Sequence, residues 1–225
     1  MTVRERLLNW FVKFLLFATS KIDAAEMKEI PKRGPAVLIS NHTSNIEGPL
    51  YFVLLRPRKV TALGKKELWD SPITRVFMDT WNIIKLNRAS GDLEAIRNSF
   101  KALDNGYILG IAPEGTRSKN GKLKKGKAGT TFIATKRRVP VIPMVQWGLH
   151  NIMKNLKKLQ QTRVNIRVGR PFYLEKKDGS RINAEDRRKM ADEMMYQLAV
   201  LLPEKYRGAY SNLSKMSTDY ITFIN

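Results

Sequence analysis

The sequence has no cysteine among its 225 residues and only two histidines, His42 and His150. The absence of cysteine excludes disulfide bonds, thiolate nucleophiles and metal sites built on thiolate ligands, and it fits a reducing cytoplasm. The two histidines lie far apart, and neither belongs to an H-E-x-x-H pattern, so we expect no metal site. Chemistry that needs an imidazole base has only these two residues to use.

Two glycine-rich patterns are also absent. Without G-x-G-x-x-G or G-x-S-x-G, neither a dinucleotide cofactor nor a serine-hydrolase nucleophile has support. Residues 121–127 match the glycine and lysine positions of a nucleotide P-loop. However, Ala128 follows them where Mg²⁺ binding needs Ser or Thr, and no strand directly precedes them. We therefore expect no nucleotide P-loop and no bound cofactor.

Acidic residues are scarce. The chain has 41 Lys and Arg against 20 Asp and Glu, which gives a formal net charge of +21. An excess of this size favours a polyanionic partner, either nucleic acid or an anionic membrane, over a merely soluble basic surface. We find no zinc-finger spacing, no aromatic RNA-binding strand and no basic-region zipper. An anionic membrane surface is therefore the expected partner and nucleic acid is not, although charge alone leaves nucleic acid open.

The longest apolar stretch, residues 7–18, is too short to span a membrane. As a helix it would measure only ~18 Å, against ~30 Å for the hydrocarbon core, and Lys13 interrupts it. Apolar residues fall on one face and polar residues on the other, which predicts an amphipathic helix lying in a membrane surface. A helix that faces the protein core and a signal peptide cleaved near residues 18–20 are the alternatives. The expected polar face holds Glu5, Arg6, Asn9 and Lys13, and the expected membrane contacts are Trp10, Phe11, Phe14 and Phe17.

Strands and helices alternate along the rest of the chain. Apolar or alternating runs predict strands at residues 36–40, 60–63, 82–86, 107–111, 141–145 and 163–168. Helical periodicity predicts helices at 47–55, 93–103, 130–135 and 184–202, and a helical region from 65 to 70 that is broken at Pro72. This order predicts an α/β fold with a largely parallel mixed sheet flanked by helices. We assign residues 1–25 to the membrane-associating helix, 26–207 to one domain and 208–225 to a loosely ordered tail.

His42 follows the predicted strand 36–40, and Glu47 lies five residues further on. In open α/β sheets, functional residues gather beyond the carboxyl ends of the strands. A neutral imidazole there can take a proton from a hydroxyl, while a carboxylate holds the other ring nitrogen and stabilises the imidazolium. Both residues are therefore candidate catalytic residues. The alternative is a histidine at a helix start whose acidic neighbour is solvated.

A second candidate site follows the predicted strand 107–111. Residues 113–118 read Pro-Glu-Gly-Thr-Arg-Ser, and a glycine turn with a hydroxyl and a guanidinium suits phosphate. Lysines crowd the next segment, Lys124 among them, and would form a basic rim that faces phosphate or lipid headgroups. Arg88, just past the strand at 82–86, would add a second guanidinium. A polar surface turn and an ordinary surface arginine are the alternatives.

Taken together, these segments resemble the glycerolipid acyltransferase family, and its 1-acylglycerol-3-phosphate (lysophosphatidic acid) acyltransferases in particular. The family block N-H-x-x-x-x-D is similar to residues 41–47, F-P-E-G-T-R-S to residues 112–118 and V-P-(I/V)-(I/V)-P-V to residues 139–144. A block that ends in arginine is matched loosely by residues 83–88, and a lysine-glycine segment by residues 123–126. The resemblance covers about residues 30–150.

The resemblance implies a glycerol-3-phosphate acyltransferase-like fold and the transfer of an acyl chain to the sn-2 hydroxyl of lysophosphatidate, which makes phosphatidate in phospholipid synthesis. The donor would be an acyl thioester of acyl carrier protein or coenzyme A, used as co-substrate. His42 would be the base and Glu47 its orienting acid. The protein would be peripheral or monotopic at the cytoplasmic face of the cell membrane. The acceptor phosphate would be bound by Arg88, Glu114, Gly115, Thr116, Arg117 and Lys124, with Glu114 orienting arginine or backbone groups.

One position departs from the family pattern. The usual acid is aspartate, whereas this chain has Glu47, an HX4E motif whose side chain is longer by one methylene. Related lipid acyltransferases with other acceptors also carry glutamate here. Another lysophospholipid or a glycolipid is therefore the alternative acceptor. The alternative from a different class is a non-catalytic basic protein that binds membranes or nucleic acid.

Overall fold

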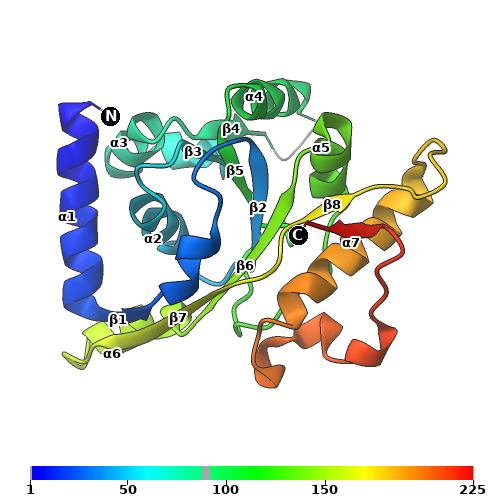
Figure 1. The fold of residues 1–225 in the computed structure, drawn as a ribbon. Helices are drawn as coiled ribbons and strands as arrows, with labels where there is room; N and C mark the ends of the chain where they lie inside the picture. Colours follow the sequence, from blue (N-terminus) through cyan, green and yellow to red (C-terminus); the bar gives the residue numbers. More distant parts are fainter. Residues whose placement is uncertain (1, 88–91, 225) are drawn as a thin grey trace.

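The computed structural model describes residues 2–87 and 92–224. Within these residues nine strands form one sheet with helices on both faces (Figure 1). The strands are β1 (Ser20–Asp23), β2 (Ala36–Ser40), β3 (Val60–Lys65), β4 (Ile84–Leu86), β5 (Ile108–Ile111), β6 (Val141–Trp147), β7 (Thr162–Val168), β8 (Phe172–Leu174) and β9 (Ile221–Phe223). The α-helices are α1 (Val3–Thr19), α2 (Glu47–Leu54), α3 (Pro72–Thr80), α4 (Leu93–Asp104), α5 (Gly129–Arg137), α6 (Ile152–Leu156) and α7 (Ala184–Ala199). Short 3₁₀-helices are η1 (Ala25–Glu29), η2 (Lys66–Trp69), η3 (Leu149–Asn151), η4 (Glu204–Tyr206), η5 (Gly208–Tyr210) and η6 (Leu213–Lys215).

The sheet is mixed but largely parallel, which confirms the predicted fold class. Its order is β1-β7-β6-β2-β5-β3-β4, and β8 pairs with both β6 and β9. The neighbours β6, β2, β5, β3 and β4 all run parallel. β7 and β8 run antiparallel to β6, and β1 is parallel to β7. The carboxyl ends of β2, β5 and β6 therefore meet at one edge of the sheet.

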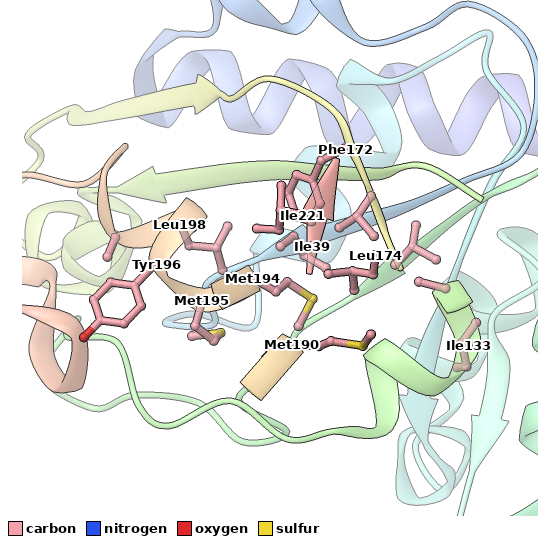
Figure 2. Close-up of a cluster of buried hydrophobic side chains, with 14 of the residues drawn as sticks. Ile39, Ile133, Phe172, Leu174, Met190, Met194, Met195, Tyr196, Leu198 and Ile221 are labelled. Carbon is pink, nitrogen blue, oxygen red and sulfur yellow. The ribbon is translucent and has the colours of Figure 1, made fainter. Parts of the chain in front are cut away.

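The central strands are buried on both faces. Along β2, Val37 and Ile39 pack into one hydrophobic core, while Leu38 packs into the other, because alternate side chains of a strand point to opposite faces. The first core lies between the sheet and α7, where Met190 and Met194 lie among the strand residues that Figure 2 labels. The second core lies beneath α1 and α2. Continuous apolar runs such as residues 36–39 are what strands buried on both faces require.

Helix α1 packs on the second core but leaves its aromatic side uncovered. Val12 and Leu16 are buried, and so is Asn9, which accepts a hydrogen bond from Trp81 Nε1 over 2.9 Å. Asn9 therefore faces the protein, which corrects its assignment to a solvated polar face. The aromatic residues are not core-facing, because 47% to 68% of each remains exposed: Trp10, Phe11, Phe14 and Phe17. In the described parts of the chain, no helix has the length and apolar content needed to cross a bilayer.

Two segments differ from the sequence prediction. Pro72 does not end a helical region; it is the first residue of α3, because the first helical position needs no backbone N–H donor. The loosely ordered tail is wrong for residues 208–224. Within that segment β9 pairs with β8, and Tyr210 and Ile221 are buried in the first core. Their scattered positions in a polar segment gave no periodic signal from which to predict this packing.

Candidate active site

Three parallel strands bring the candidate residues together. In the register of the sheet, Ile39 of β2 lies beside Ile111 of β5, and Ser40 lies beside Met144 of β6. His42, Glu114 and Gln146 all lie at the edge where these strands end. This is the edge at which open α/β sheets place their functional groups.

His42 and Glu47 form a close pair. Glu47 is the first residue of α2, and its Oε2 lies 2.6 Å from His42 Nδ1. The Glu47 side chain is only 5% exposed, whereas the imidazole is 27% exposed and lines a cavity. A carboxylate at Nδ1 favours the tautomer with the proton on that nitrogen, which leaves Nε2 as the acceptor. The alternative of a solvated acidic neighbour is therefore wrong, and the pair has the geometry of a base held by a buried acid.

The second oxygen of Glu47 is held by four donors. Oε1 accepts hydrogen bonds from the backbone N–H groups of Thr43 (2.5 Å) and Ser44 (2.7 Å). It also accepts from Thr43 Oγ1 (2.8 Å) and from Gln146 Nε2 (2.7 Å). These donors fix the carboxylate so that its Oε2 faces the imidazole. They also explain how a glutamate serves at this position: its longer side chain reaches both the loop and Gln146.

Sequence reasoning missed Gln146. Its side chain is completely buried at the carboxyl end of β6, and Nε2 also donates to Thr43 Oγ1 over 2.6 Å. Its backbone pairs with the Asn41 side chain, since Gln146 N donates to Asn41 Oδ1 (2.9 Å) and Asn41 Nδ2 donates to Gln146 O (2.8 Å). Asn41 therefore continues the β2–β6 pairing and directs the chain into His42. The signal that sequence reasoning passed over is one amide inside an otherwise apolar strand.

Glu114 braces the backbone around His42. Its Oε1 accepts from His42 N over 2.8 Å, and its Oε2 accepts from Lys124 N over 2.9 Å. Burial raises the pKa of the Glu114 carboxyl, and the two backbone donors act in the opposite direction. Ser118 N in turn donates to His42 O over 2.7 Å. Glu114 thus orients backbone groups, as expected of a carboxylate that cannot itself bind phosphate.

The expected phosphate residues form a cationic loop beside His42. Gly115 has φ +69°, and a Cβ atom built there would lie 3.1 Å from the Lys127 side chain. Lys124 Nζ donates to Thr116 Oγ1 over 2.6 Å. Arg117 is exposed on the same loop, and Lys127 lines the cavity next to Gly115. Arg88, the other arginine assigned to this site, lies outside the described residues.

The carboxyl-terminal segment holds this loop in place. Leu123 N donates to Tyr206 O (2.9 Å), and Ala209 N donates to Leu123 O (3.0 Å). The Tyr210 hydroxyl accepts from Gly126 N over 3.0 Å and donates to Asp192 Oδ1 over 2.7 Å. Burial raises the pKa of Tyr210, so the phenol stays protonated. Residues expected to be a loose tail therefore support the candidate phosphate loop.

An apolar cavity of about 520 Å³ begins at His42. It extends between the sheet and helices α2, α4 and α5, and its lining is mostly aliphatic and aromatic. Tyr51 lines it with its hydroxyl 2.8 Å from Ser40 Oγ, and burial raises the Tyr51 pKa well above its ordinary value. Leu55 and Val60 lie at the far end from the histidine. The cavity suits an extended hydrocarbon chain, because apolar surface is favoured in such a lining. Across the described ranges, no group of three or more His, Asp and Glu residues could hold a metal ion.

Comparisons with known proteins point in one direction. A family model described as Acyltransferase matches residues 21–147. A chloroplastic 1-acyl-sn-glycerol-3-phosphate acyltransferase of Brassica napus is 27% identical over 179 residues, which cover 77% of this chain and 51% of the relative. The 1-acyl-sn-glycerol-3-phosphate acyltransferase of Borreliella burgdorferi is 27% identical over 149 residues, which cover 63% of this chain and 58% of the relative. The chain thus spans about half the length of these curated relatives.

One solved structure has a similar fold. The crystal structure of the 1-acyl-sn-glycerophosphate acyltransferase of Thermotoga maritima superposes with a TM-score of 0.61 at 26% sequence identity. The match covers 84% of this chain and 75% of that one. The similarity of fold therefore extends over most of this chain.

Proposed function

The chain belongs to the acyltransferase family, whose model matches 127 of its 225 residues, and from this premise we propose that it is a 1-acyl-sn-glycerol-3-phosphate O-acyltransferase. The proposed reaction moves an acyl chain from a thioester to the sn-2 hydroxyl of lysophosphatidate. The observation that carries the proposal is the His42–Glu47 pair, which lies between an apolar cavity and a cationic loop. The substrate itself is taken from the names of the relatives.

In the proposed mechanism, His42 Nε2 removes the proton from the acceptor hydroxyl as its oxygen attacks the thioester carbonyl carbon. The tetrahedral intermediate collapses with cleavage of the carbon–sulfur bond, and the proton on Nε2 passes to the leaving sulfur. The products are an ester and a free thiol, so atoms and charge balance. Glu47 keeps the ring oriented and stabilises the imidazolium while it carries the proton.

We assign the apolar cavity to the acyl chain of the donor. His42 lines this cavity, so an acyl chain bound there with its carbonyl end at His42 would present that carbonyl to the base. Burial of a methylene is worth ~0.8 kcal/mol, so a long chain gains several kcal/mol there. The donor is the thioester of acyl carrier protein or coenzyme A, and no other cofactor enters the proposal.

The cationic loop is assigned to the acceptor phosphate. Lys124 and Lys127 lie on either side of the Gly115 turn, and Arg117 extends from the same loop. Cations of this kind pair with phosphate oxygens through charge-assisted hydrogen bonds. The two hydrogen bonds of Glu114 link the cationic loop, at Lys124 N, to the backbone of His42. A phosphate bound by this loop would therefore place the neighbouring glycerol hydroxyls near the base.

The exposed aromatic side of α1 supports a place on a membrane. Trp10 and Phe14 stack with ring centroids 5.9 Å apart, and Phe11 and Phe17 are exposed near them. Aromatic residues on a helix that lies flat in the interface are typical of peripheral or monotopic proteins. With the excess of basic residues, this favours an anionic surface at the cytoplasmic face of the cell membrane.

A thiol-release assay tests the proposed function. Purified protein with an acyl thioester and lysophosphatidate is expected to release thiol and form phosphatidate. His42→Ala is expected to lower the rate by about 10²–10⁴ while folding and vesicle binding persist. Near-normal turnover in that variant would contradict the role of His42 as base.

The choice of acceptor is tested in the same assay. The glutamate at position 47, where aspartate is usual, leaves another lysophospholipid or a glycolipid as a second candidate acceptor. Matched lysophospholipid and glycolipid acceptors, with and without a terminal phosphomonoester, are compared in turn. Lys124→Ala is expected to raise KM only for acceptors with the phosphomonoester. A preference for acceptors without it would favour another lysophospholipid or a glycolipid. No thiol release with any acceptor, together with salt-dependent binding to DNA or RNA, would favour the non-catalytic alternative.

A further inference from the structure

A second cavity, of about 700 Å³, lies at the opposite edge of the sheet. Its walls come from residues 27–28 and 30–34 before β2, residues 54–59 before β3 and residues 105–106 before β5. These segments precede the amino ends of parallel strands, whereas His42 lies beyond their carboxyl ends. We call this cavity the amino-edge pocket. It is separate from the cationic loop that we assign to the acceptor phosphate.

The amino-edge pocket is strongly cationic. Of the fifteen described residues that line it, six are basic and none is acidic, compared with 41 basic residues among the 225 of the whole chain. The concentration of charge therefore exceeds what composition alone would give. A cavity lined by one sign of charge attracts counter-ions strongly. The basic residues are Lys28, Lys32, Arg33, Arg56, Arg58 and Lys59.

Arg58 ties the three walls together. Its Nε donates to Pro31 O (3.0 Å), its Nη1 donates to Gly106 O (2.9 Å) and its Nη2 donates to Gly34 O. Each carbonyl belongs to a wall segment that precedes β2 or β5. The guanidinium therefore holds the wall segments of the pocket together through these three bonds. Burial lowers the pKa of Arg58. The cavity is held by side-chain bonds rather than left between unconnected loops.

Other cations are left for a ligand. Lys32 and Arg33 are exposed at the rim of the pocket. Arg56 pairs with Glu5 of α1 over 2.5 Å, yet its Nε is buried without a hydrogen-bond partner among the described residues. A buried donor without an acceptor is costly unless a ligand or water supplies one. The pair with Glu5 also places the pocket next to the helix whose aromatic side is exposed.

The floor of the pocket is apolar. Ile30 and Leu55 are buried in the second core, and Met27 and Leu54 pack against it. Leu55 lines the catalytic cavity as well, so the two cavities share this side chain in their walls. A ligand that fits has an anionic head for the rim and an apolar part for the floor. Phosphate suits the head because several cations can share its oxygens.

From these features we infer that the amino-edge pocket binds a phosphate-headed amphiphile, as a free molecule or as a lipid drawn from the bilayer. Its head lies among Lys32, Arg33 and Lys59, and its apolar part covers Ile30 and Leu55. The site is distinct from the candidate active site and takes no part in acyl transfer.

Dodecyl phosphate below its micellar concentration is the first probe, with inorganic phosphate and neutral dodecyl maltoside as comparisons. Dodecyl phosphate is expected to shift the backbone amide NMR signals of Gly34 and Gly106. The double variant Lys32→Glu/Arg33→Glu is expected to weaken this binding at least tenfold. The matched control Lys136→Glu/Arg188→Glu makes the same charge change at exposed positions on α5 and α7, and it is expected to change affinity less than twofold.

Vesicles distinguish the two sources of the ligand. If phosphatidate in a phosphatidylcholine vesicle protects Lys32 and Lys59 from acylating reagents as dodecyl phosphate does, the ligand is a bilayer lipid; protection by the free probe alone assigns a free molecule. Unmoved Gly34 and Gly106 signals, equal losses in both double variants, or equal affinity for inorganic phosphate would overturn the inference. The double variant Lys32→Glu/Arg33→Glu is expected to keep wild-type thiol release in detergent. If the wild-type protein itself releases no thiol, the proposed function is contradicted, whereas the binding of dodecyl phosphate to the amino-edge pocket is still tested.

Discussion

Gln146 Nε2 donates to Glu47 Oε1 across 2.7 Å, although the two residues lie 99 positions apart in the sequence. The same amide donates to Thr43 Oγ1 over 2.6 Å. The orientation of the acid beside His42 therefore depends on β6, the strand that pairs with β2 in the sheet, as much as on the HX4E motif itself. The bond makes Gln146 a positioning residue in the proposed mechanism, since it acts on the base through Glu47.

The first prediction concerns Gln146→Met, which keeps the volume and removes both donors. We expect kcat to fall about tenfold to a hundredfold, because a hydrogen bond to a charged group is worth ~1.5–3 kcal/mol. KM for both substrates is expected to stay within twofold. The measurement is steady-state kinetics over a range of pH, in which a mispositioned acid also shifts the ionisation limb of kcat. Loss of thermal stability with unchanged kinetics would show that the amide is only structural.

The second prediction concerns Glu47 itself. Glu47→Gln is expected to lower kcat by about 10²–10⁴, because an amide cannot accept from four donors at one atom and from His42 at the other. Glu47→Asp keeps the charge and is expected to retain measurable turnover, with a kcat between those of the wild-type protein and Glu47→Gln. Turnover by Glu47→Gln that exceeds that of Glu47→Asp would contradict the role of a charged acid. Circular dichroism of both variants controls for folding.

The sequence predicted the centre of the fold well and its margins poorly. The strands at 36–40, 107–111 and 141–145 are continuous apolar runs, and all three are present because each is buried on both faces. β1, β8 and β9 were not predicted, since each has only three or four residues and is defined by the strand it pairs with. The antiparallel direction of β7 is likewise a property of its pairing with β6, which periodicity does not report.

The same division holds for the candidate site. His42 and Glu47 were predicted because they are five residues apart, and one local turn brings them into contact. Glu114 was predicted as an orienting group on chemical grounds, and its two backbone partners agree with that role. Gln146 and Tyr210 were missed, because their partners come from distant parts of the chain. Single-sequence reasoning finds local pairs, and long-range hydrogen bonds need the fold.

A third prediction concerns the end of the apolar cavity. Leu55→Ala shortens a side chain that lines both this cavity and the amino-edge pocket. We expect the variant to accept longer acyl thioesters relative to shorter ones than the wild-type protein does. The ratio of thiol-release rates for a series of chain lengths is the measurement. The substitution also costs ~2–5 kcal/mol of stability, so Leu55→Met, which conserves volume, is the control and should keep the wild-type ratio. An unchanged ratio in Leu55→Ala would place the end of the chain elsewhere.

A fourth prediction concerns pH and the start of α7. Asp186 accepts from Asn183 N (2.9 Å), from the Tyr220 hydroxyl (2.8 Å) and from Lys176 Nζ (3.2 Å), and these partners lower its pKa from the ordinary value of an aspartate. A carboxyl with a lowered pKa in the folded state contributes stability above its ordinary pKa and loses it as the pH falls through the folded value. Asp186→Asn is therefore expected to be less stable than wild type at pH 7, with a difference that shrinks below about pH 4. Urea unfolding at both pH values is the measurement, and a constant difference would contradict the assignment.

The last prediction concerns the support of the cationic loop by the carboxyl-terminal segment. Tyr210→Phe removes the hydroxyl that links Gly126 N to Asp192. Because the bond positions the loop that carries Lys124 and Lys127, its loss should weaken phosphate binding more than chemistry. We expect KM for lysophosphatidate to rise about threefold to tenfold, with kcat changed less than twofold, since such a bond is worth ~0.5–1.5 kcal/mol.

Tyr196→Phe is the matched control for this prediction. Tyr196 is buried and contacts Tyr210 edge-on with ring centroids 5.0 Å apart, but within the described residues no hydrogen bond joins its hydroxyl to the loop. Its loss should leave both kinetic constants near wild type. An acceptor without a phosphomonoester should show no change in KM with either variant, because the loop then has no phosphate to bind. A fall in kcat that is equal for both acceptors would mean that Tyr210 supports the whole site through its packing, and the selective role of the loop in phosphate binding would have to be abandoned.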